Sequence, residues 1–333
     1  MSDFEERLVD ALQPARYFFL AQTIEYGLRS GVLSALAEAP GRPLTQVATS
    51  LGMDTGRLGG LLRYWSAEGL VIEPDSPALT RKGSDVLDFR PWHELLLGGY
   101  GRTLDELPAV MRDGTAYASR DGAMVGKGSC GISQYDAIPL LRKLFEHMAE
   151  PDPILIDLGC GDGTVLLDLC GDTRRGIGID PVDANVASAR ALAVARNRAH
   201  DVRFDVGTAE DYAFAEAGTV PCFIAAFSLQ EVLEQRGRSV VVSLVRRLLG
   251  HPGAYLAVVE VDYDPAVVQG HGLGMAYYNP YYLLHEITNQ RLETTDFWTG
   301  LFAEAGTQVV TRLTTDPEVD STGLEIGFLL RSA

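Results

Sequence analysis

A glycine-rich turn between an apolar run and a helical stretch has the residue types and spacing that point most directly to chemistry. The segment ILIDLGCGDGTVLLDL holds Gly159, Gly161 and Gly163, and Asp157 precedes them inside the apolar run. Glycine permits a tight turn and lets a bound molecule lie against the backbone. The turn therefore predicts a site for a small organic ligand at the end of a strand.

The spacing G-x-G-x-G and the acid before it favour S-adenosylmethionine over a dinucleotide. A dinucleotide presents a pyrophosphate to a helix N-terminus, whereas S-adenosylmethionine has a cationic amino-acid end that Asp157 can hold. Asp180 ends the next apolar run, where a carboxylate can accept hydrogen bonds from ribose hydroxyls. We expect S-adenosylhomocysteine as the product. Further residues expected at this cofactor site are Pro181, Thr208, Ala209, Glu210, Phe227 and Ser228.

The C-terminal part alternates short apolar runs with helical stretches. Runs at 154–158, 176–180, 202–206, 222–227 and 254–261 are of strand length, which predicts a parallel sheet with crossover helices. Two further runs, 308–313 and 324–330, are joined by the turn-rich TTDPEVDST and predict an antiparallel hairpin. The expected fold class is α/β, a doubly wound sheet that ends in a hairpin.

The N-terminal part is expected to be helical. Residues 4–36 carry apolar residues at three- and four-residue spacing, and 44–83 indicate a helix-turn-helix followed by a two-stranded wing. A winged helix can bind DNA or serve as a dimerisation module. The candidate recognition helix offers only Arg57 and Arg63 as cations, too few to neutralise many phosphates. We therefore expect a homodimerisation domain at 1–86, a helical capping segment at 87–150 and a cofactor domain at 151–333.

Composition narrows the function classes. The formal net charge of -17 repels phosphate backbones, so we expect a small-molecule substrate and no nucleic acid. No apolar run is long enough to span a membrane, the start of the chain lacks a signal-peptide pattern, and four scattered cysteines form no C-x-x-C pair. We expect a cytoplasmic protein without membrane contact.

Taken together, these motifs resemble a known family. The chain is similar to small-molecule methyltransferases built from an N-terminal α-helical winged-helix dimerisation domain and a class I, Rossmann-like methyltransferase domain. YYNPYYLLHEITNQRL and RDGAMVGKGS resemble a bacterial subgroup of natural-product enzymes. That subgroup contains α-keto-acid C-methyltransferases and a free-arginine N-methyltransferase of streptozotocin biosynthesis.

The loop FSLQEVLEQRG after the fourth strand is expected to face the transferable methyl group. Relatives carry a histidine there, as a general base or as a metal ligand, whereas this chain has Gln230 and Glu231. A carboxylate binds a guanidinium through paired hydrogen bonds. Glu231 is therefore the candidate to bind and activate a guanidino group; as an alternative, it is only an acid that stabilises a helix N-terminus.

Other residues are candidates for the rest of the acceptor site. His285 is either a direct substrate contact or a hydrogen-bonded histidine of the wall. Glu260, Asp262 or Glu286 could supply a second carboxylate. The carboxylate of an amino-acid substrate could be held by the cations Lys127 and Arg120 or by the neutral donors Tyr135 and Asn279.

Three functions compete at this point. The first is N-methylation of a small cationic amino acid, with free L-arginine and its guanidino group as the leading candidate, without a metal. The second is C-methylation of an α-keto acid such as 2-ketoarginine or an aryl pyruvate, with His285 in a metal site. The third is a transcriptional regulator that keeps the fold as a sensor, which the acidic charge and the intact glycine loop disfavour.

Overall fold

A computed structural model describes residues 1–149, 152–172, 174–214 and 219–333. The chain divides into two compact units, Met1–Gly101 and Arg102–Ala333. Residues 87–101 thus belong with the N-terminal unit and 102–149 with the C-terminal unit. The boundary expected between residues 150 and 151 lies outside the described residues. No described helix has the length and apolar character needed to cross a membrane.

The N-terminal unit has the helix-turn-helix and wing that the sequence predicts. Ser2 and Glu5 form a capping box at the start of the first helix, and Gly31, in a left-handed conformation, separates the first helix from the second. Its elements are α1 Asp3–Arg29, α2 Val32–Glu38, α3 Leu44–Leu51, α4 Thr55–Ala67, β1 Val71–Ile72, β2 Ala78–Leu79, α5 Arg81–Asp88, α6 Arg90–His93 and a π-helical turn Glu94–Gly99.

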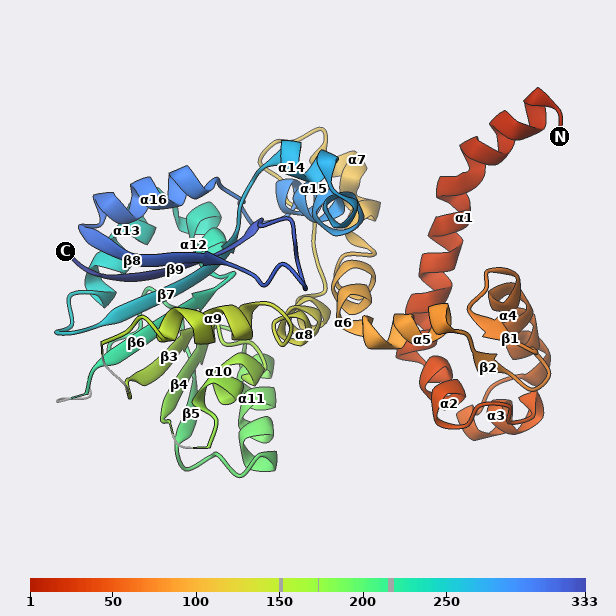
Figure 1. The fold of residues 1–333 in the computed structure, drawn as a ribbon, viewed down its shortest axis with the longest axis horizontal. Coiled ribbons are helices and arrows are strands. Elements are labelled where there is room, and N and C mark those ends of the chain that lie inside the picture. The colour runs from red at the N-terminus through yellow and green to blue at the C-terminus, as the bar shows by residue number, and fades with distance from the viewer. Residues whose placement is uncertain (150–151, 173, 215–218) are drawn as a thin grey trace. The chain divides into compact units, whose positions relative to one another are not determined.

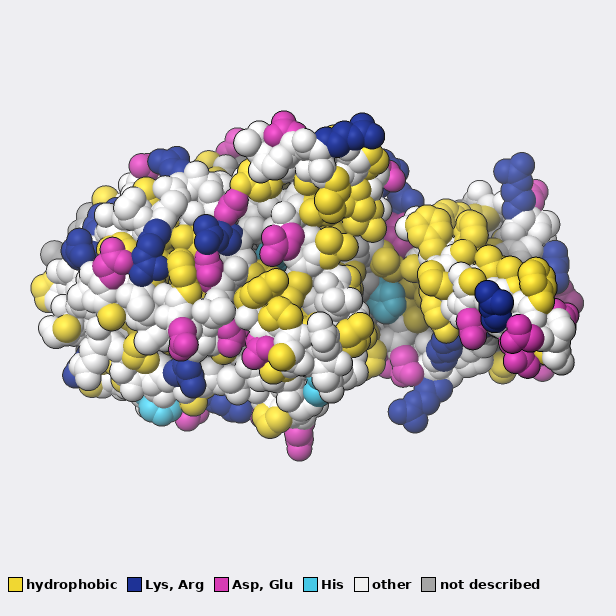
Figure 2. All heavy atoms as spheres, turned by 90° about the horizontal axis from the view of Figure 1, so that it is seen from above, with side chains coloured by type: hydrophobic (Ala, Val, Ile, Leu, Met, Phe, Trp, Pro, Cys, Tyr) yellow, Lys and Arg dark blue, Asp and Glu magenta, His cyan; other side chains and the backbone are white. Residues whose placement is uncertain are grey.

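The core of this unit forms around Trp65 on α4, which is fully buried. Its indole N–H donates to the Thr23 hydroxyl at 3.1 Å, and a Cβ at Gly27 would lie 2.4 Å from the Trp65 ring. Glycine therefore lets α1 approach α4 closely. The first turns of α1 extend beyond the other helices of the unit (Figure 1), and apolar side chains gather on the surface of this unit (Figure 2). Exposed apolar residues of α1 include Phe4, Leu8, Val9, Leu12, Tyr17, Phe18 and Phe19.

The C-terminal unit contains a seven-stranded sheet of order β5-β4-β3-β6-β7-β9-β8 in the described residues. The first five strands in this order are parallel, and β9 is antiparallel to both β7 and β8, which confirms the expected sheet and hairpin. The strands are β3 Ile154–Leu158, β4 Gly176–Asp180, β5 Val202–Val206, β6 Pro221–Ala226, β7 Tyr255–Val261, β8 Thr307–Thr314 and β9 Glu325–Ser332.

Helices cover both faces of the sheet (Figure 1). The helices α9 Ala137–Phe145, α10 Thr164–Cys170 and α11 Asp183–Ala195 pack on one face. The helices α12 Leu229–Arg236, α13 Arg238–Leu248 and α16 Thr295–Glu304 pack on the other. Because both faces are covered, the central strands are apolar at every position that does not carry a site residue.

Short helices gather beyond one end of the sheet. They include α7 Leu107–Val110, α14 Pro265–Gly270 and α15 Asn279–Ile287, with α8 Gly122–Ile132 nearby (Figure 1). The chain enters α14 directly from the carboxyl end of β7. The helical cap is therefore built next to the strand ends where ligands of doubly wound folds bind.

Candidate active site

The glycine loop between β3 and α10 adopts a conformation that only glycine takes without strain. Gly159, Gly161 and Gly163 have φ angles of 93°, 53° and 80°. The backbone N–H groups of Gly159 and Cys160 both donate to the Ile179 carbonyl, at 2.7 and 3.0 Å. The loop is therefore fixed to the end of β4 by backbone contacts, and the positive φ values explain the spacing of the glycines.

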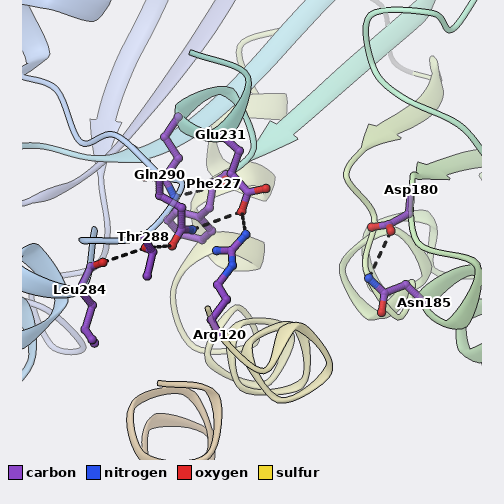
Figure 3. Close-up of polar contacts among 9 residues, drawn as sticks. Arg120, Asp180, Asn185, Phe227, Glu231, Leu284, Thr288 and Gln290 are labelled. Atoms are coloured by element: carbon purple, nitrogen blue, oxygen red, sulfur yellow. Dashed lines mark hydrogen bonds and ion pairs between the residues drawn. The ribbon is translucent and has the colours of Figure 1, made fainter. Parts of the chain in front are cut away.

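Asp180 connects the loop to the end of β4. Its carboxylate accepts from the N–H of Gly161 at 3.0 Å and from the N–H of Val182 at 2.9 Å. It also accepts from the side-chain amide of Asn185 at 3.2 Å, the contact drawn in Figure 3. A carboxylate has about four acceptor positions, so capacity remains for a hydroxyl of a ligand. These contacts orient Asp180 before any ligand arrives.

Asp157 lies on β3 and is 3% exposed. Its burial and the nearby negative charge of Asp180 raise its pKa to about 7. A cation placed beside it would favour the ionised form. Asp157 is therefore a buried acid whose charge depends on what is bound next to it.

The turn from β6 into α12 comes close to the glycine loop. Phe227, expected at the end of the strand, lies just beyond it because its φ is 56°, and its N–H donates to the Val259 carbonyl at 2.8 Å. A Cβ at Gly159 would lie 3.1 Å from the Ser228 Cβ. The Ser228 hydroxyl is buried and has no hydrogen-bond partner among the described residues. It is a donor available to a ligand.

The segment after β5, which contains Thr208, Ala209 and Glu210, contacts α12 and α13. Arg247 donates to the Ala209 carbonyl at 2.8 Å, and Arg236 lies 3.9 Å from the Glu210 carboxylate. Thr208, Ala209 and Glu210 are all half-buried. Because β3, β4 and β5 are parallel, this segment, which follows β5, lies at the same edge of the sheet as the glycine loop, which follows β3.

An ion pair joins the first turn of α12 to the segment before α8. The Arg120 guanidinium donates to a Glu231 oxygen at 2.7 Å, and the Gln290 side-chain amide donates to the same oxygen at 3.2 Å (Figure 3). The carboxylate expected to bind a substrate guanidinium therefore already holds the guanidinium of Arg120. Three segments far apart in the sequence meet in this Arg120–Glu231–Gln290 network.

His285 on α15 is 2% exposed and stacks on Tyr281 with ring centroids 3.9 Å apart. Its Nδ1 lies 2.8 Å from the Tyr281 carbonyl, which can only accept, so Nδ1 carries the proton. Burial lowers the pKa of His285 to about 3, against the opposing effect of that hydrogen bond, and the positive charge of Arg120 lowers it further. The imidazole is therefore neutral. Its Nε2 lone pair has no partner among the described residues.

Glu260 at the end of β7 is 1% exposed. One of its carboxyl oxygens accepts from the N–H of Gln230 at 3.2 Å, and the other, Oε2, has no partner in the described part of the chain. Burial raises the pKa of Glu260 to about 8. Near pH 7 the carboxyl is therefore mostly protonated, and the backbone donors at Oε1 leave the proton on Oε2.

Several other expected site residues either have partners within the fold or lie at the surface. The two oxygens of Asp262 accept from the N–H and hydroxyl of Thr295, at 2.7 and 2.6 Å. The exposed residues of the expected set are Lys127, Tyr135, Pro181, Asn279 and Glu286.

Gln290 was not among the residues singled out from the sequence. It follows α15 in the segment ITNQRL and is buried although it is polar. Its neighbours Thr288, Asn289 and Arg291 are polar too, so nothing in the sequence distinguishes it as a buried residue. Nor does the sequence reveal its partner Glu231, which is 59 residues away.

The geometry can be compared with known proteins. Residues 155–253 match the family described as "Methyltransferase domain". Over 332 residues the chain is 49% identical to the 2-ketoarginine methyltransferase of Streptomyces arginensis, a match that covers 98% of this chain and 96% of that protein. The chain belongs to the S-adenosylmethionine-dependent small-molecule methyltransferases.

Solved structures of similar fold include two methyltransferases of low sequence identity. The mitomycin 7-O-methyltransferase MmcR is 19% identical, with a TM-score of 0.68 and coverage of 99% of this chain and 98% of that one. The O-methyltransferase NcsB1 of neocarzinostatin biosynthesis, solved with S-adenosylmethionine, is 16% identical, with a TM-score of 0.63 and coverage of 94% and 96%. These likenesses support the class I fold and its N-terminal helical domain.

The residues of this methyltransferase fit S-adenosylmethionine. The glycine loop offers a surface without side chains, Asp180 retains acceptor capacity, and the buried Ser228 hydroxyl lacks a partner among the described residues. Asp157 supplies a carboxylate that a cation would ionise. The methyl donor brings a sulfonium-bound, electrophilic methyl group, so the rest of the site must present a nucleophile to it.

Proposed function

We propose that this methyltransferase transfers a methyl group to the carbon next to the keto group of 2-ketoarginine. The observation that carries the proposal is its 49% identity, over 98% of the chain, to a 2-ketoarginine methyltransferase. This relative favours the α-keto-acid alternative over the expected N-methylation of free arginine. The pairing of Glu231 with Arg120 also favours it, because that carboxylate already has a guanidinium partner.

Methylation at this carbon requires the loss of one proton. The keto group makes the adjacent C–H bond acidic, and the electron pair left after deprotonation forms the new bond to the transferred methyl group. The sulfonium sulfur keeps its electron pair, so S-adenosylhomocysteine and one proton are the other products. The protein must therefore supply a base and must stabilise an enolate.

His285 is our candidate for the base. Its Nδ1 proton is fixed by the Tyr281 carbonyl, so a lone pair remains on the buried Nε2. The low pKa of about 3 comes first from burial of the ring and to a smaller degree from the positive charge of Arg120. A substrate carboxylate held by Arg120 would offset the positive charge and raise the proton affinity of the ring.

Arg120 is our candidate to hold the substrate carboxylate. A guanidinium binds a carboxylate through two parallel hydrogen bonds, and its positive charge also stabilises the enolate as it forms. Glu231 and Gln290 act on this step as positioning residues, because together they fix the Arg120 side chain. Glu260 can donate its Oε2 proton to the substrate keto oxygen, since its carboxyl is mostly protonated near pH 7.

The donor set around His285 does not fit a metal ion. No group of three His, Cys, Asp or Glu side chains that could hold a metal is present in the described ranges. The charge that acts on His285 is the positive charge of Arg120, which opposes a second cation. No step of the proposed reaction passes through a metal.

Turnover assays with labelled S-adenosylmethionine and 2-ketoarginine, L-arginine or phenylpyruvate test the proposal. We expect 2-ketoarginine to be methylated at carbon, with NMR locating the new methyl group beside the keto group. Arg120→Met should lose at least a hundredfold in kcat/KM, and metal chelators should leave activity unchanged. Methylation of arginine at nitrogen, or loss of activity on chelation, would overturn the proposal.

We also propose that the enzyme is a cytoplasmic homodimer of natural-product biosynthesis. Exposed apolar side chains along α1 offer a surface that a second copy would cover. Cys160, Cys170 and Cys222 are buried thiols, which suits a reducing compartment.

A further inference from the structure

Three buried carboxyl groups meet where β9 begins. Asp136 caps α9, Glu325 is the first residue of β9, and Asp320 lies in the loop before that strand. Each is less than a tenth exposed. Together with Tyr278 they form what we call the Asp136 cluster, whose function is not explained by the methyl-transfer site.

Only some of the polar atoms in the cluster form hydrogen bonds. Tyr278 donates its hydroxyl to Asp320, whose second oxygen accepts from the N–H and hydroxyl of Thr322, at 2.8 and 2.6 Å. Asp136 accepts from the N–H of Ala137. None of the three carboxyls forms an ion pair with a Lys, Arg or His in the part of the chain that the structure describes.

Two polar atoms in the cluster lack partners. Glu325 is 3% exposed and its Oε1 has no hydrogen bond to any described residue. The Thr315 hydroxyl, 2% exposed, acts on the Glu325 carboxyl but likewise makes no hydrogen bond of good geometry to described residues. Burying such atoms without partners costs about 1–3 kcal/mol each, so an additional donor is expected to bind here.

Two of the acids interact directly. Burial, followed by the negative charge of Asp136 and a hydrogen bond to it, raises the pKa of Glu325. Burial raises the pKa of Asp136 to about 6, although the hydrogen bond with Glu325 acts to lower it. The two carboxyls therefore retain a proton that they would lose if a cation were bound between them. The cluster is built to accept hydrogen bonds and positive charge.

The cluster lies at the same edge of the sheet as the candidate active site. Glu325 is paired with Val261, the residue after Glu260. Tyr278 directly precedes α15, which carries His285, and Tyr281 lies between the two, with its ring 6.4 Å from Tyr278 and 3.9 Å from His285. One aromatic ring thus separates the cluster from the proposed base.

This separation matches the length of the proposed substrate. Four bonds of about 1.5 Å link the reacting carbon of 2-ketoarginine to its guanidinium carbon, which gives a reach of roughly 5 Å. Hydrogen-bond distances of about 3 Å at each end bring the span to roughly 11 Å. The ring centroids lie 3.9 Å apart for His285 and Tyr281 and 6.4 Å apart for Tyr281 and Tyr278, so the His285 and Tyr278 rings are separated by no more than the length of this span.

On the basis of the proposed function, we propose that the Asp136 cluster binds the guanidinium group at the far end of the substrate, with Glu325 and Asp136 as its carboxylate partners. A guanidinium has five N–H donors in a planar fork, which suits a site rich in acceptors and poor in donors. Specificity for a cationic keto acid would then come from this cluster, and reactivity would come from Arg120, His285 and Glu260.

The test compares 2-ketoarginine with 2-ketocitrulline, which has the same shape but an uncharged urea group. Wild type should prefer 2-ketoarginine at least a hundredfold in kcat/KM. In Glu325→Gln the preference should fall below tenfold, mainly through KM, while turnover of 2-ketocitrulline changes little. Glu318→Gln, an exposed acid in the loop before β9, is the matched control and should keep the full preference.

Binding calorimetry with the same two ligands separates this inference from the proposed function. If wild type turns over neither keto acid, the proposed function fails, and calorimetry still shows whether Glu325→Gln weakens 2-ketoarginine binding selectively. An unchanged preference in folded Glu325→Gln and Asp136→Asn overturns the guanidinium site. Thermal unfolding identifies any variant that fails to fold, and in that case the remaining variant decides.

Discussion

Asp157 and Glu260 are buried carboxyls at the ends of β3 and β7, and they respond differently to a ligand. The pKa of Asp157 is raised to about 7 by burial and by Asp180, so a cation beside it would ionise it. The pKa of Glu260 is raised to about 8 by burial, and its free oxygen points to a role as a hydrogen-bond donor. Two acids at one edge of the sheet can thus play opposite parts, Asp157 as an ionised partner of a cation and Glu260 as a protonated hydrogen-bond donor.

Asp157 predicts that the affinity for S-adenosylmethionine depends on pH. If the cation of the ligand requires ionised Asp157, a group with pKa of about 7 loses a proton on binding. Affinity should then fall about fivefold from pH 7 to pH 6. Calorimetry in two buffers of different ionisation enthalpy measures the proton release. Asp157→Asn should bind more weakly with a flat pH profile, and a flat profile in wild type contradicts the assignment.

Glu260 predicts a pH-dependent cost in stability. The unfolded chain loses this proton near pH 4.5 and the folded chain near pH 8, so the folded state binds more protons in between and stability falls as pH rises. Glu260→Gln should therefore melt on the order of 5 °C above wild type at pH 8, with little difference at pH 5. Glu286→Gln, exposed on α15, is the control and should show no such gain.

Some residues of the site could be identified from the sequence and others could not. The glycines and the acids at the ends of strands can be recognised because they stand at characteristic distances from one another along the sequence. The Arg120–Glu231 pair joins residues 111 positions apart, so it depends on tertiary packing that no local pattern encodes. The protonation of His285 likewise depends on burial and on the Tyr281 carbonyl, which the sequence does not reveal.

At the level of elements, the strands were predictable to within a residue or two because β3 to β7 are apolar runs with helical stretches between them. The π-helical turns at Glu94–Gly99 and Gly274–Tyr278 were not, since their sequences do not differ from those of ordinary helices. The short helices between residues 102 and 136 were also unclear. Their glycines interrupt the periodicity on which a helix assignment depends.

The glycine loop predicts different outcomes for two neighbouring substitutions. A Cβ at Gly163 would lie 2.7 Å from the Phe204 ring, so Gly163→Val should destabilise the fold by more than about 2 kcal/mol. A Cβ at Gly161 would lie 3.1 Å from the Cys130 sulfur, a milder contact. Gly161→Val should unfold at a higher temperature than Gly163→Val and still lose S-adenosylmethionine binding at least a hundredfold. Calorimetry and thermal unfolding of both variants measure this difference.

On the scale of the whole molecule, the exposed apolar residues of α1 predict a homodimer. Light scattering at micromolar concentration should report twice the chain mass for wild type. Leu8→Glu with Leu12→Glu places charge on this surface and should yield monomers, whereas Asp10→Ser on the same helix should leave the dimer intact. A monomeric wild type would show that α1 does not serve as the interface.

The position of β9 has a consequence for biosynthesis. It is the last of the seven strands along the chain, yet it lies between β7 and β8. While the ribosome is still making it, β7 has one unpaired edge and β8 has no neighbour, so an adhesive strand edge is transiently exposed. The sheet can close only after β9 has emerged, so we expect chaperones that shield strand edges to bind this unit until then.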